Sequence, residues 1–410
     1  MKNKKKIVID MIINIISTAM PTIALQLILL PILSGKLSGN DYGLVLTFLS
    51  LFNVLPATIG VVLNNIRLLY DNDYKKNKLV GDFQLLLVIF ESINVVITLI
   101  LCFFYINNSN IIDIILVISI SILWLMREYY IVTFRLILNY KSIFINNIFL
   151  VVGYFIGFIL YEITKYWQFI YIIGLIFSGI HIYYKSNIIK EKIVKTKFFR
   201  KVSIDCILLT IATLMSRIIT FSDKLILYPL IGGTMVSVYY VSTIFSKIIS
   251  MAINPINSVA LSYLSKLNKK PDKLFKQTYI VGLMVCILGY IVSIIISRPI
   301  LSFLYPKYVD AAMKYIFVNS ATICVNVLVS IITPFVLKFF DIKWQIVING
   351  LSAVTYILLT IVLFYCFGMM GFCIGILLSN IIKLITTTFI FIFMKGKYYD
   401  KKNNQINIEM

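Results

Sequence analysis

The chain is poor in the residues from which catalytic and metal sites are usually built. It contains a single histidine, His181, and charged residues make up only 13% of its 410 residues. There is no Walker loop, dinucleotide fingerprint or nucleophile elbow, so we do not expect it to hydrolyse nucleotides. One histidine without a nearby acidic cluster cannot form a zinc site of the usual composition. The sequence therefore predicts that the chain is not an enzyme and has no metal and no cofactor.

Apolar residues make up 60% of the chain, and its mean hydropathy is +0.95. These values lie far outside the composition of water-soluble domains. A membrane-spanning helix needs about 20 mostly apolar residues. Apolar runs of this length predict transmembrane helices at 8–33, 42–66, 79–106, 111–138, 142–163, 167–184, 204–231, 235–263, 275–298, 312–337, 343–367 and 369–394. The basic start of the chain precedes an apolar run that lacks a clear cleavage pattern, so we predict that this run is kept as the first helix.

The positions of lysine and arginine orient these spans. Most of the 38 basic residues fall at the two ends of the chain and in alternate loops, which predicts that both termini are cytoplasmic. The predicted organisation is an N-terminal six-helix lobe (1–184), a basic cytoplasmic linker (185–203), a C-terminal six-helix lobe (204–394) and a cytoplasmic tail (395–410). Basic loops orient helices and contact anionic lipids, so the net charge of +21 indicates membrane lipids as partners, and not nucleic acid.

The two halves of the chain share a pattern of prolines. Pro31 and Pro229 lie near the ends of the first and seventh predicted spans, and Pro56 and Pro255 lie in the second and eighth. This pattern predicts a duplication. Halves with an even number of spans enter the membrane in the same orientation and can rock against each other around a central cavity.

Polar residues inside the spans are the main pointer to a site, because a charge that faces lipid is costly and usually turns to a cavity or a partner. In the seventh span Arg217 and Lys224 are seven residues apart and therefore share a helix face. The cations predicted to bind substrate are Arg67, Arg217, Lys224 and Lys247, and the predicted polar lining is Asn53, Asn64, Tyr240, Asn254 and Asn326. The asparagines have a second explanation, which is hydrogen bonding between helices.

Three acidic residues at membrane depth, Glu91, Glu128 and Asp223, are candidates for coupling transport to a proton or sodium ion. The alternative is that these carboxylates neutralise nearby cations. Glu128 lies beside Arg127 and shares a helix face with Arg135, so an internal ion pair is equally well supported.

Several segments resemble one family. The turn at 33–43, LSGKLSGNDYG, resembles the connection between helices 1 and 2 of polysaccharide exporters in the multidrug/oligosaccharidyl-lipid/polysaccharide (MOP) superfamily. Segments 221–227 (FSDKLIL) and 238–242 (VYYVS) resemble the seventh helix and the start of the eighth in that superfamily, and 298–308 resembles its turn between helices 9 and 10. In order and length the whole chain resembles O-antigen and capsule repeat-unit flippases of the Wzx type. The glycine-containing turn after the seventh helix is shorter than is usual for the family.

This resemblance implies an all-α polytopic membrane protein with a MATE-like arrangement of about twelve helices in two lobes. It implies export of an undecaprenyl-diphosphate-linked oligosaccharide, an O-antigen (lipopolysaccharide) or capsule repeat unit. Export would run from the inner to the outer leaflet of the bacterial cytoplasmic (inner) membrane by alternating access. A glycan polymerase and a chain-length regulator are the protein partners that it implies. Fixed cations suit such a substrate because they replace part of the hydration of the diphosphate.

Two other functions remain open. A drug or cation exporter of the same superfamily would share the fold, but its cavity should be acidic or apolar, whereas the charges in these spans are mainly basic. A membrane glycan polymerase, from a different class, usually has a large external loop that holds acceptor and catalytic acids. The longest predicted external stretch here runs only from about Arg298 to Asp310.

Overall fold

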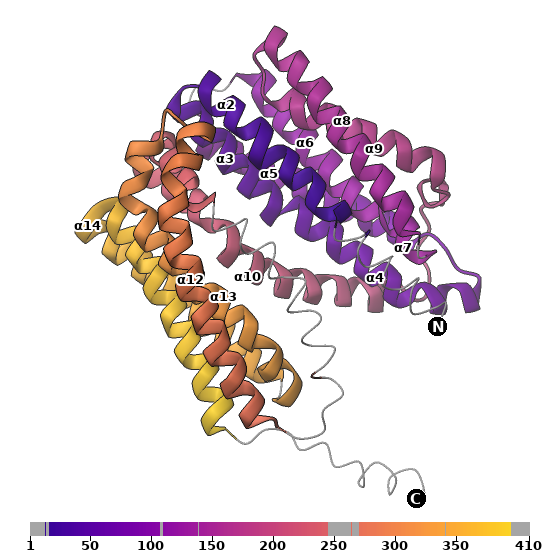
Figure 1. Cartoon of the computed structure of the whole chain (residues 1–410). Coiled ribbons are helices and arrows are strands. Elements are labelled where there is room, and N and C mark those ends of the chain that lie inside the picture. Colours follow the sequence, from indigo (N-terminus) through magenta and orange to yellow (C-terminus); the bar gives the residue numbers. More distant parts are fainter. Residues whose placement is uncertain are drawn as a thin grey trace, which may run out of the picture. The chain divides into compact units, whose positions relative to one another are not determined.

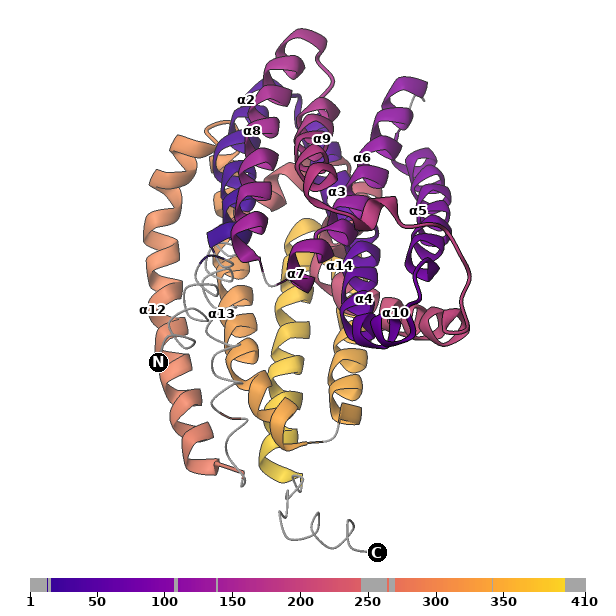
Figure 2. The same ribbon diagram turned by 90° about the vertical axis from the view of Figure 1, so that its right-hand side faces the viewer.

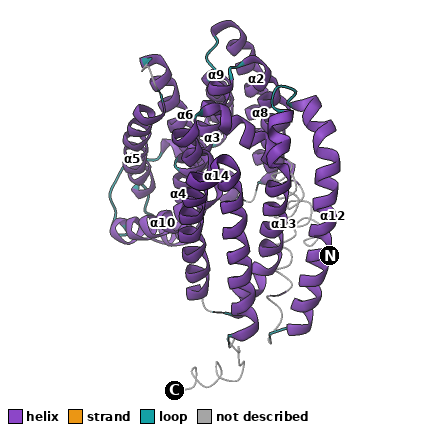
Figure 3. Cartoon of the chain, turned by 90° about the vertical axis from the view of Figure 1, so that its left-hand side faces the viewer, coloured by secondary structure: helices purple, strands orange, loops and turns teal. Residues whose placement is uncertain are grey.

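The computed structural model describes residues 13, 16–106, 110–137, 139–244, 264, 270–340 and 342–394. Every regular element in these ranges is a helix, and none of them is a strand (Figure 3). The chain divides into two compact units, Met1–Ser237 and Val238–Met410.

The first unit is a helical bundle (Figure 1). It starts with a helical segment, Ile16–Lys36, that contains the π-helix η1 (Ala24–Leu29) and the α-helix α2 (Leu30–Lys36). The helices that follow are α3 (Gly39–Val54), α4 (Pro56–Asn77), α5 (Asp82–Tyr105), α6 (Ile111–Tyr130), α7 (Val132–Leu136), α8 (Tyr140–Thr164), α9 (Gln168–Lys185), the short 3-10 turn η2 (Ile188–Lys190) and α10 (Phe199–Ile231).

The second unit contains three long helices that pack side by side (Figure 2). They are α12 (Asp272–Leu304), α13 (Val309–Phe339) and α14 (Ile342–Phe393), and residues 238–244 at the start of the unit are also helical. Gly368 interrupts α14 with a φ of 58° and a ψ of −141°, a backbone conformation that glycine adopts without strain. The two halves of α14 meet where the predicted spans 343–367 and 369–394 meet.

The predicted all-α polytopic fold class is confirmed. Ten of the twelve predicted spans coincide with described helices; the first, 8–33, is described from residue 16 and at residue 13, and the eighth, 235–263, only through residue 244. Seven helical segments of the described residues are long and apolar enough to cross a membrane, or eight if the bent helix α10 counts as one span. These segments are fewer than the predicted spans because Lys343–Phe393 contains two of them, spans 111–138 and 167–184 match none of the segments, and 235–263 is mostly outside the described residues.

The helix that carries the second predicted span is longer than the span. Hydropathy predicts that the span ends at Ile66, and α4 continues to Asn77 and stops at Lys78, which has a left-handed φ of 52°. Mean hydropathy falls after Ile66 because charged residues appear, yet Tyr70 and Tyr74 continue the buried stripe at helical spacing. Packing of this one face is enough to stabilise α4 beyond Ile66.

One proline begins a helix in this unit. Pro56 is the first residue of α4, after a break at Leu55, where the missing N–H of proline costs little because it has no partner inside the helix. Pro31 is the second residue of α2, which continues directly from η1. Pro229 lies inside α10, and Pro255 lies outside the described residues.

Candidate functional site

The linker between α9 and α10 is tied to the ends of the first-unit helices, and we call residues 186–198 the strap. Its Glu191 forms a two-pronged ion pair with Arg67 of α4, with Nη1 to Oε2 at 2.7 Å and Nη2 to Oε1 at 2.5 Å. The hydroxyl of Tyr129 also accepts from Arg67 Nη1 at 2.9 Å, and the guanidinium lies 5.0 Å from the ring centre of Phe83. Arg67 is 8% exposed, so this is a buried charge whose main partner comes from the strap.

Further contacts hold the strap along its length. Asp82, fully buried at the start of α5, accepts from the backbone N–H of Thr196 at 2.7 Å and also from the Thr196 hydroxyl. Gln84 Nε2 donates to the carbonyl of Ile188 at 2.6 Å. A side chain at Gly81 would come within 2.7 Å of a strap carbonyl, and its φ of 121° also favours glycine. The strap is therefore an integral part of this end of the unit.

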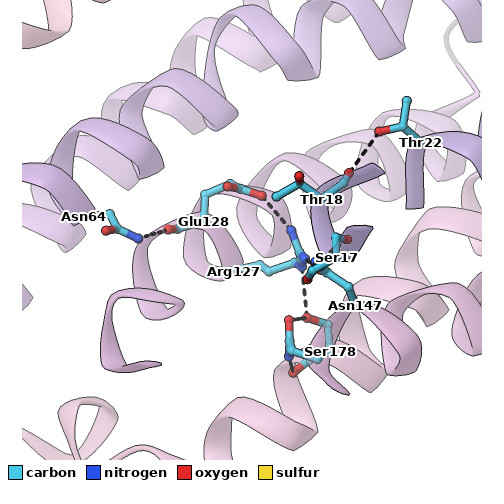
Figure 4. Close-up of polar contacts among 9 residues, drawn as sticks. Ser17, Thr18, Thr22, Asn64, Arg127, Glu128, Asn147 and Ser178 are labelled. Carbon is cyan, nitrogen blue, oxygen red and sulfur yellow. Dashed lines mark hydrogen bonds and ion pairs between the residues drawn. The ribbon is translucent and has the colours of Figure 1, made fainter. Parts of the chain in front are cut away.

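A second polar cluster centres on Arg127 of α6 (Figure 4). Its Nη1 lies 2.7 Å from Glu128 Oε1, its Nε donates to Ser178 Oγ of α9 at 3.0 Å, and its Nη2 donates to Asn147 Oδ1 of α8. Asn147 in turn donates to the carbonyl and the hydroxyl of Ser17, both at 2.8 Å. The cluster connects four helical segments and neutralises the Arg127 charge locally.

Arg135 of α7 sits next to this cluster but has a different kind of environment. Its Nη1 donates to Asn64 Oδ1 at 2.7 Å and to Asn65 Oδ1 at 3.0 Å, both on α4. Asn64 also donates to the carbonyl of Glu128 at 2.9 Å (Figure 4). In the part of the chain that the structure describes, no carboxylate lies within ion-pair distance of Arg135. Two neutral amides orient this half-buried cation and leave its charge uncompensated.

Helix α10 carries three of the predicted site residues. Lys224 is 3% exposed, and its Nζ lies 3.0 Å from Oδ1 of the adjacent Asp223. Arg217 is half-buried, with its guanidinium 5.9 Å from the ring centre of Phe221, and no described carboxylate lies within ion-pair distance of it. The helix bends by 64° between its segments Phe199–Met215 and Thr220–Ile231, which places Arg217 at the bend.

The remaining predicted residues have other environments. Glu91 accepts from Asn94 Nδ2 at 3.1 Å, and Asn53 donates to a carbonyl of its own helix at 2.7 Å. In the second unit Tyr240 is buried, and Asn326 is exposed. Lys247 and Asn254 lie outside the described residues.

Sequence patterns missed the pairing in this region. Glu128 and Arg135 share a helix face, but Glu128 pairs with its chain neighbour Arg127, and Arg135 turns to the α4 amides. Glu191 was not predicted as a site residue. The only available signal was that it is the one acidic residue among the lysines of the linker.

Across the described ranges no group of three or more His, Cys, Asp and Glu residues is placed to hold a metal ion.

No protein-family model and no curated protein matches the sequence. Solved structures do match the fold. An inward-facing multidrug-resistance MATE-family transporter of the MOP superfamily gives a TM-score of 0.71 at 10% identity, covering 92% of this chain and 97% of that chain. The lipid II flippase MurJ, in an inward closed conformation, gives 0.71 at 16% identity, covering 93% and 87%. The Vibrio cholerae MATE transporter VcmN in its bent form gives 0.57 at 11% identity, covering 94% and 95%. The chain therefore has the fold shared by MATE transporters and a lipid flippase of the MOP superfamily.

Proposed function

We propose that the chain is a flippase that moves an undecaprenyl-diphosphate-linked oligosaccharide, an O-antigen or capsule repeat unit, from the inner to the outer leaflet of a bacterial cytoplasmic membrane. The observation that carries this proposal is uncompensated positive charge on two half-buried arginines inside predicted spans. Arg135 and Arg217 have no carboxylate within ion-pair distance among the described residues. A charge inside a span is costly without a counter-ion, and an anionic ligand would supply the missing charge.

Diphosphate is the anion that these side chains suit best. A guanidinium presents several N–H donors in a fixed plane and binds phosphate oxygens in pairs. The amides of Asn64 and Asn65 hold one edge of Arg135 and leave its remaining donors available for such a ligand. The resemblance in fold to a lipid II flippase supports a lipid-linked saccharide as the cargo.

The paired cations take a secondary role in this proposal. Arg67 is held by Glu191, and Lys224 is held by Asp223, so a diphosphate would have to displace a carboxylate to reach either of them. The Arg67 Nε has no hydrogen-bond partner among the described residues, so the carboxylate does not use all of its donors. We assign the first contact with the diphosphate to Arg135 and Arg217, with Lys247 as a further candidate.

Coupling to an ion gradient is a separate part of the proposal. Glu128 and Asp223 already have a basic neighbour at 2.7 Å and 3.0 Å, whereas the described partner of Glu91 is the neutral amide of Asn94. Glu91 is therefore the first of the three carboxylates to test for proton or sodium coupling. Transport that is insensitive to both ion gradients would remove this part and leave the flippase proposal standing.

The experiment is transbilayer movement of a fluorescent undecaprenyl-diphosphate oligosaccharide in liposomes that contain the purified protein. We compare wild type with Arg135→Gln and Arg217→Gln, and with Arg298→Gln as the matched control because Arg298 is 69% exposed. Loss of a charge-assisted hydrogen bond predicts a roughly 10- to 100-fold slower rate for the first two variants and little change for the control. Absence of wild-type movement for a range of such lipids, together with export of organic cations, would favour a drug exporter.

A further inference from the structure

A cavity of about 610 Å³, open to the protein surface, lies between α4 and α10, and its lining contains no residue of the strap or of the Arg127 cluster. These two helices pack side by side in the first unit (Figures 1 and 2). The lining has an ionic part formed by Asp73, Lys201 and Asp205, and Tyr70 lies between the two helices. Neither the proposed transport function nor the ion-coupling residues make use of this cavity.

The polarity of the lining changes in order along the helices. Asp73 is four residues from the end of α4, and Lys201 is in the first turn of α10, so both lie where the helices meet the strap. Ile66 on α4 and Leu208 and Ala212 on α10 lie several turns further in, and all three are apolar. The cavity is therefore ionic at the helix ends and apolar toward the helix centres. Headgroups and acyl chains follow the same order in a lipid leaflet.

The ionic groups of opposite sign do not neutralise each other. In the described ranges neither Asp73 nor Lys201 has an ion-pair partner. Lys201 Nζ lies 5.5 Å from the ring centre of Tyr70, and the Tyr70 hydroxyl donates to Asp205 Oδ2, which leaves the second oxygen of Asp205 available. Asp73, Asp205 and Lys201 line the same cavity. Acidic residues are therefore in the majority here, although the chain as a whole has a net charge of +21. The cavity thus offers anionic acceptors and a cationic donor separately.

We propose that this cavity binds a phospholipid with a primary-amine headgroup, phosphatidylethanolamine, from the surrounding membrane. The ammonium of the lipid donates hydrogen bonds to Asp73 and Asp205, its phosphate accepts from Lys201, and an acyl chain covers the exposed side chains of Leu69 and Leu208. Leu69 is 71% exposed and Leu208 is 60% exposed, so both have apolar surface for a chain to cover. Phosphatidylglycerol has no cation for the two acids, and the quaternary ammonium of phosphatidylcholine cannot donate a hydrogen bond.

The test is lipid competition on the full chain, purified in mixed micelles and measured by native mass spectrometry. Phosphatidylethanolamine is offered at equal concentration against phosphatidylglycerol in one series and against phosphatidylcholine in another. A charge-assisted hydrogen bond predicts a roughly 10-fold preference for the amine lipid in both series. Asp73→Asn should reduce that preference to about one-fold, and Lys201→Gln should lower retention of all three phospholipids.

Asp71→Asn is the matched control, because Asp71 lies two residues away on α4 but pairs with Lys75 at 2.6 Å and does not line the cavity. This variant should keep the preference. A wild-type protein without preference, a preference that Asp73→Asn leaves unchanged in folded protein, or unchanged phospholipid retention in Lys201→Gln would overturn the proposal. The readout is lipid retention and not flipping, so failure here leaves the proposed transport function unaffected, and the reverse also holds.

Discussion

Replacing Glu191 with glutamine should loosen the strap, because it leaves the buried Arg67 guanidinium without its counter-charge. Removing one partner of a buried ion pair typically costs about 3–5 kcal/mol. The Glu191 side chain is 17% exposed, glutamine keeps one acceptor oxygen, and Tyr129 and Phe83 stay in contact with Arg67. We therefore expect a loss of about 2 kcal/mol, below the usual range for a fully buried pair.

Trypsin cleavage of the strap measures this loss directly. The strap contains several exposed lysines, but a protease can cut beside them only when the strap backbone detaches and fits its active site. The cleavage rate therefore follows the population of the open form when opening is fast. A change of about 2 kcal/mol predicts roughly 30-fold faster cleavage of Glu191→Gln than of wild type. The thermal unfolding midpoint in detergent should fall in the same variant.

Glu162→Gln is the control, because Glu162 pairs with Lys36 at 2.6 Å with both side chains about one-third or more exposed. Exposed pairs contribute only about 0–1 kcal/mol, so this variant should cleave at the wild-type rate. The double variant Arg67→Met with Glu191→Met removes the uncompensated charge and should recover part of the lost stability. Equal cleavage of Glu191→Gln and wild type would refute the idea that this ion pair holds the strap.

Two further predictions concern packing and the buried cluster. A Cβ at Gly43 would lie 1.9 Å from the carbonyl oxygen of Gly233, so Gly43→Ala should lower the unfolding midpoint and the yield of folded protein. Gly35→Ala, with nothing within 4 Å of the new atom, should leave both unchanged, and equal behaviour of the two variants would contradict the packing argument. Asn147→Ala leaves a donor of the buried Arg127 without its acceptor and should cost about 1–3 kcal/mol, measured as the midpoint of thermal unfolding in detergent. An unchanged midpoint would mean that water or another side chain replaces the amide.

Hydropathy located most of the fold because it is a local property. A helix in a membrane must satisfy its own backbone hydrogen bonds and present about 20 apolar residues to the lipid, so each span is encoded within its own segment. The break at Gly368 was placed for the same reason, since it separates two apolar runs. The extension of α4 past Ile66 was not predicted, because averaging over a window hides a single buried stripe that continues to Tyr74.

The roles of the charged residues were less accessible to sequence. Helical spacing placed Arg217 and Lys224 on one face, but it gave no sign that Lys224 pairs with Asp223 while Arg217 contacts an aromatic ring. Spacing also indicated an ion pair between Glu128 and Arg135. Glu191, which forms the two-pronged ion pair with Arg67, lies 124 residues away in the strap. Arg127 and Lys224 pair with chain neighbours, which a search for residues on one helix face passes over. The pair of Arg67 with Glu191 depends on distances between distant segments, about which helical period carries no information.

The sequence by itself determined that this chain is a bundle of membrane-spanning helices rich in positive charge. That outcome follows from composition and from the free-energy cost of exposing apolar groups to water or polar backbone groups to lipid. It can therefore be derived without knowing which residues are in contact. Only the tertiary structure decided which charges are neutralised. Packing of α4 against the strap brings Arg67 to the carboxylate of Glu191, and packing of α7 against α4 brings Arg135 to the amides of Asn64 and Asn65. The difference between a structural cation and one available to an anionic ligand is therefore a property of the folded protein.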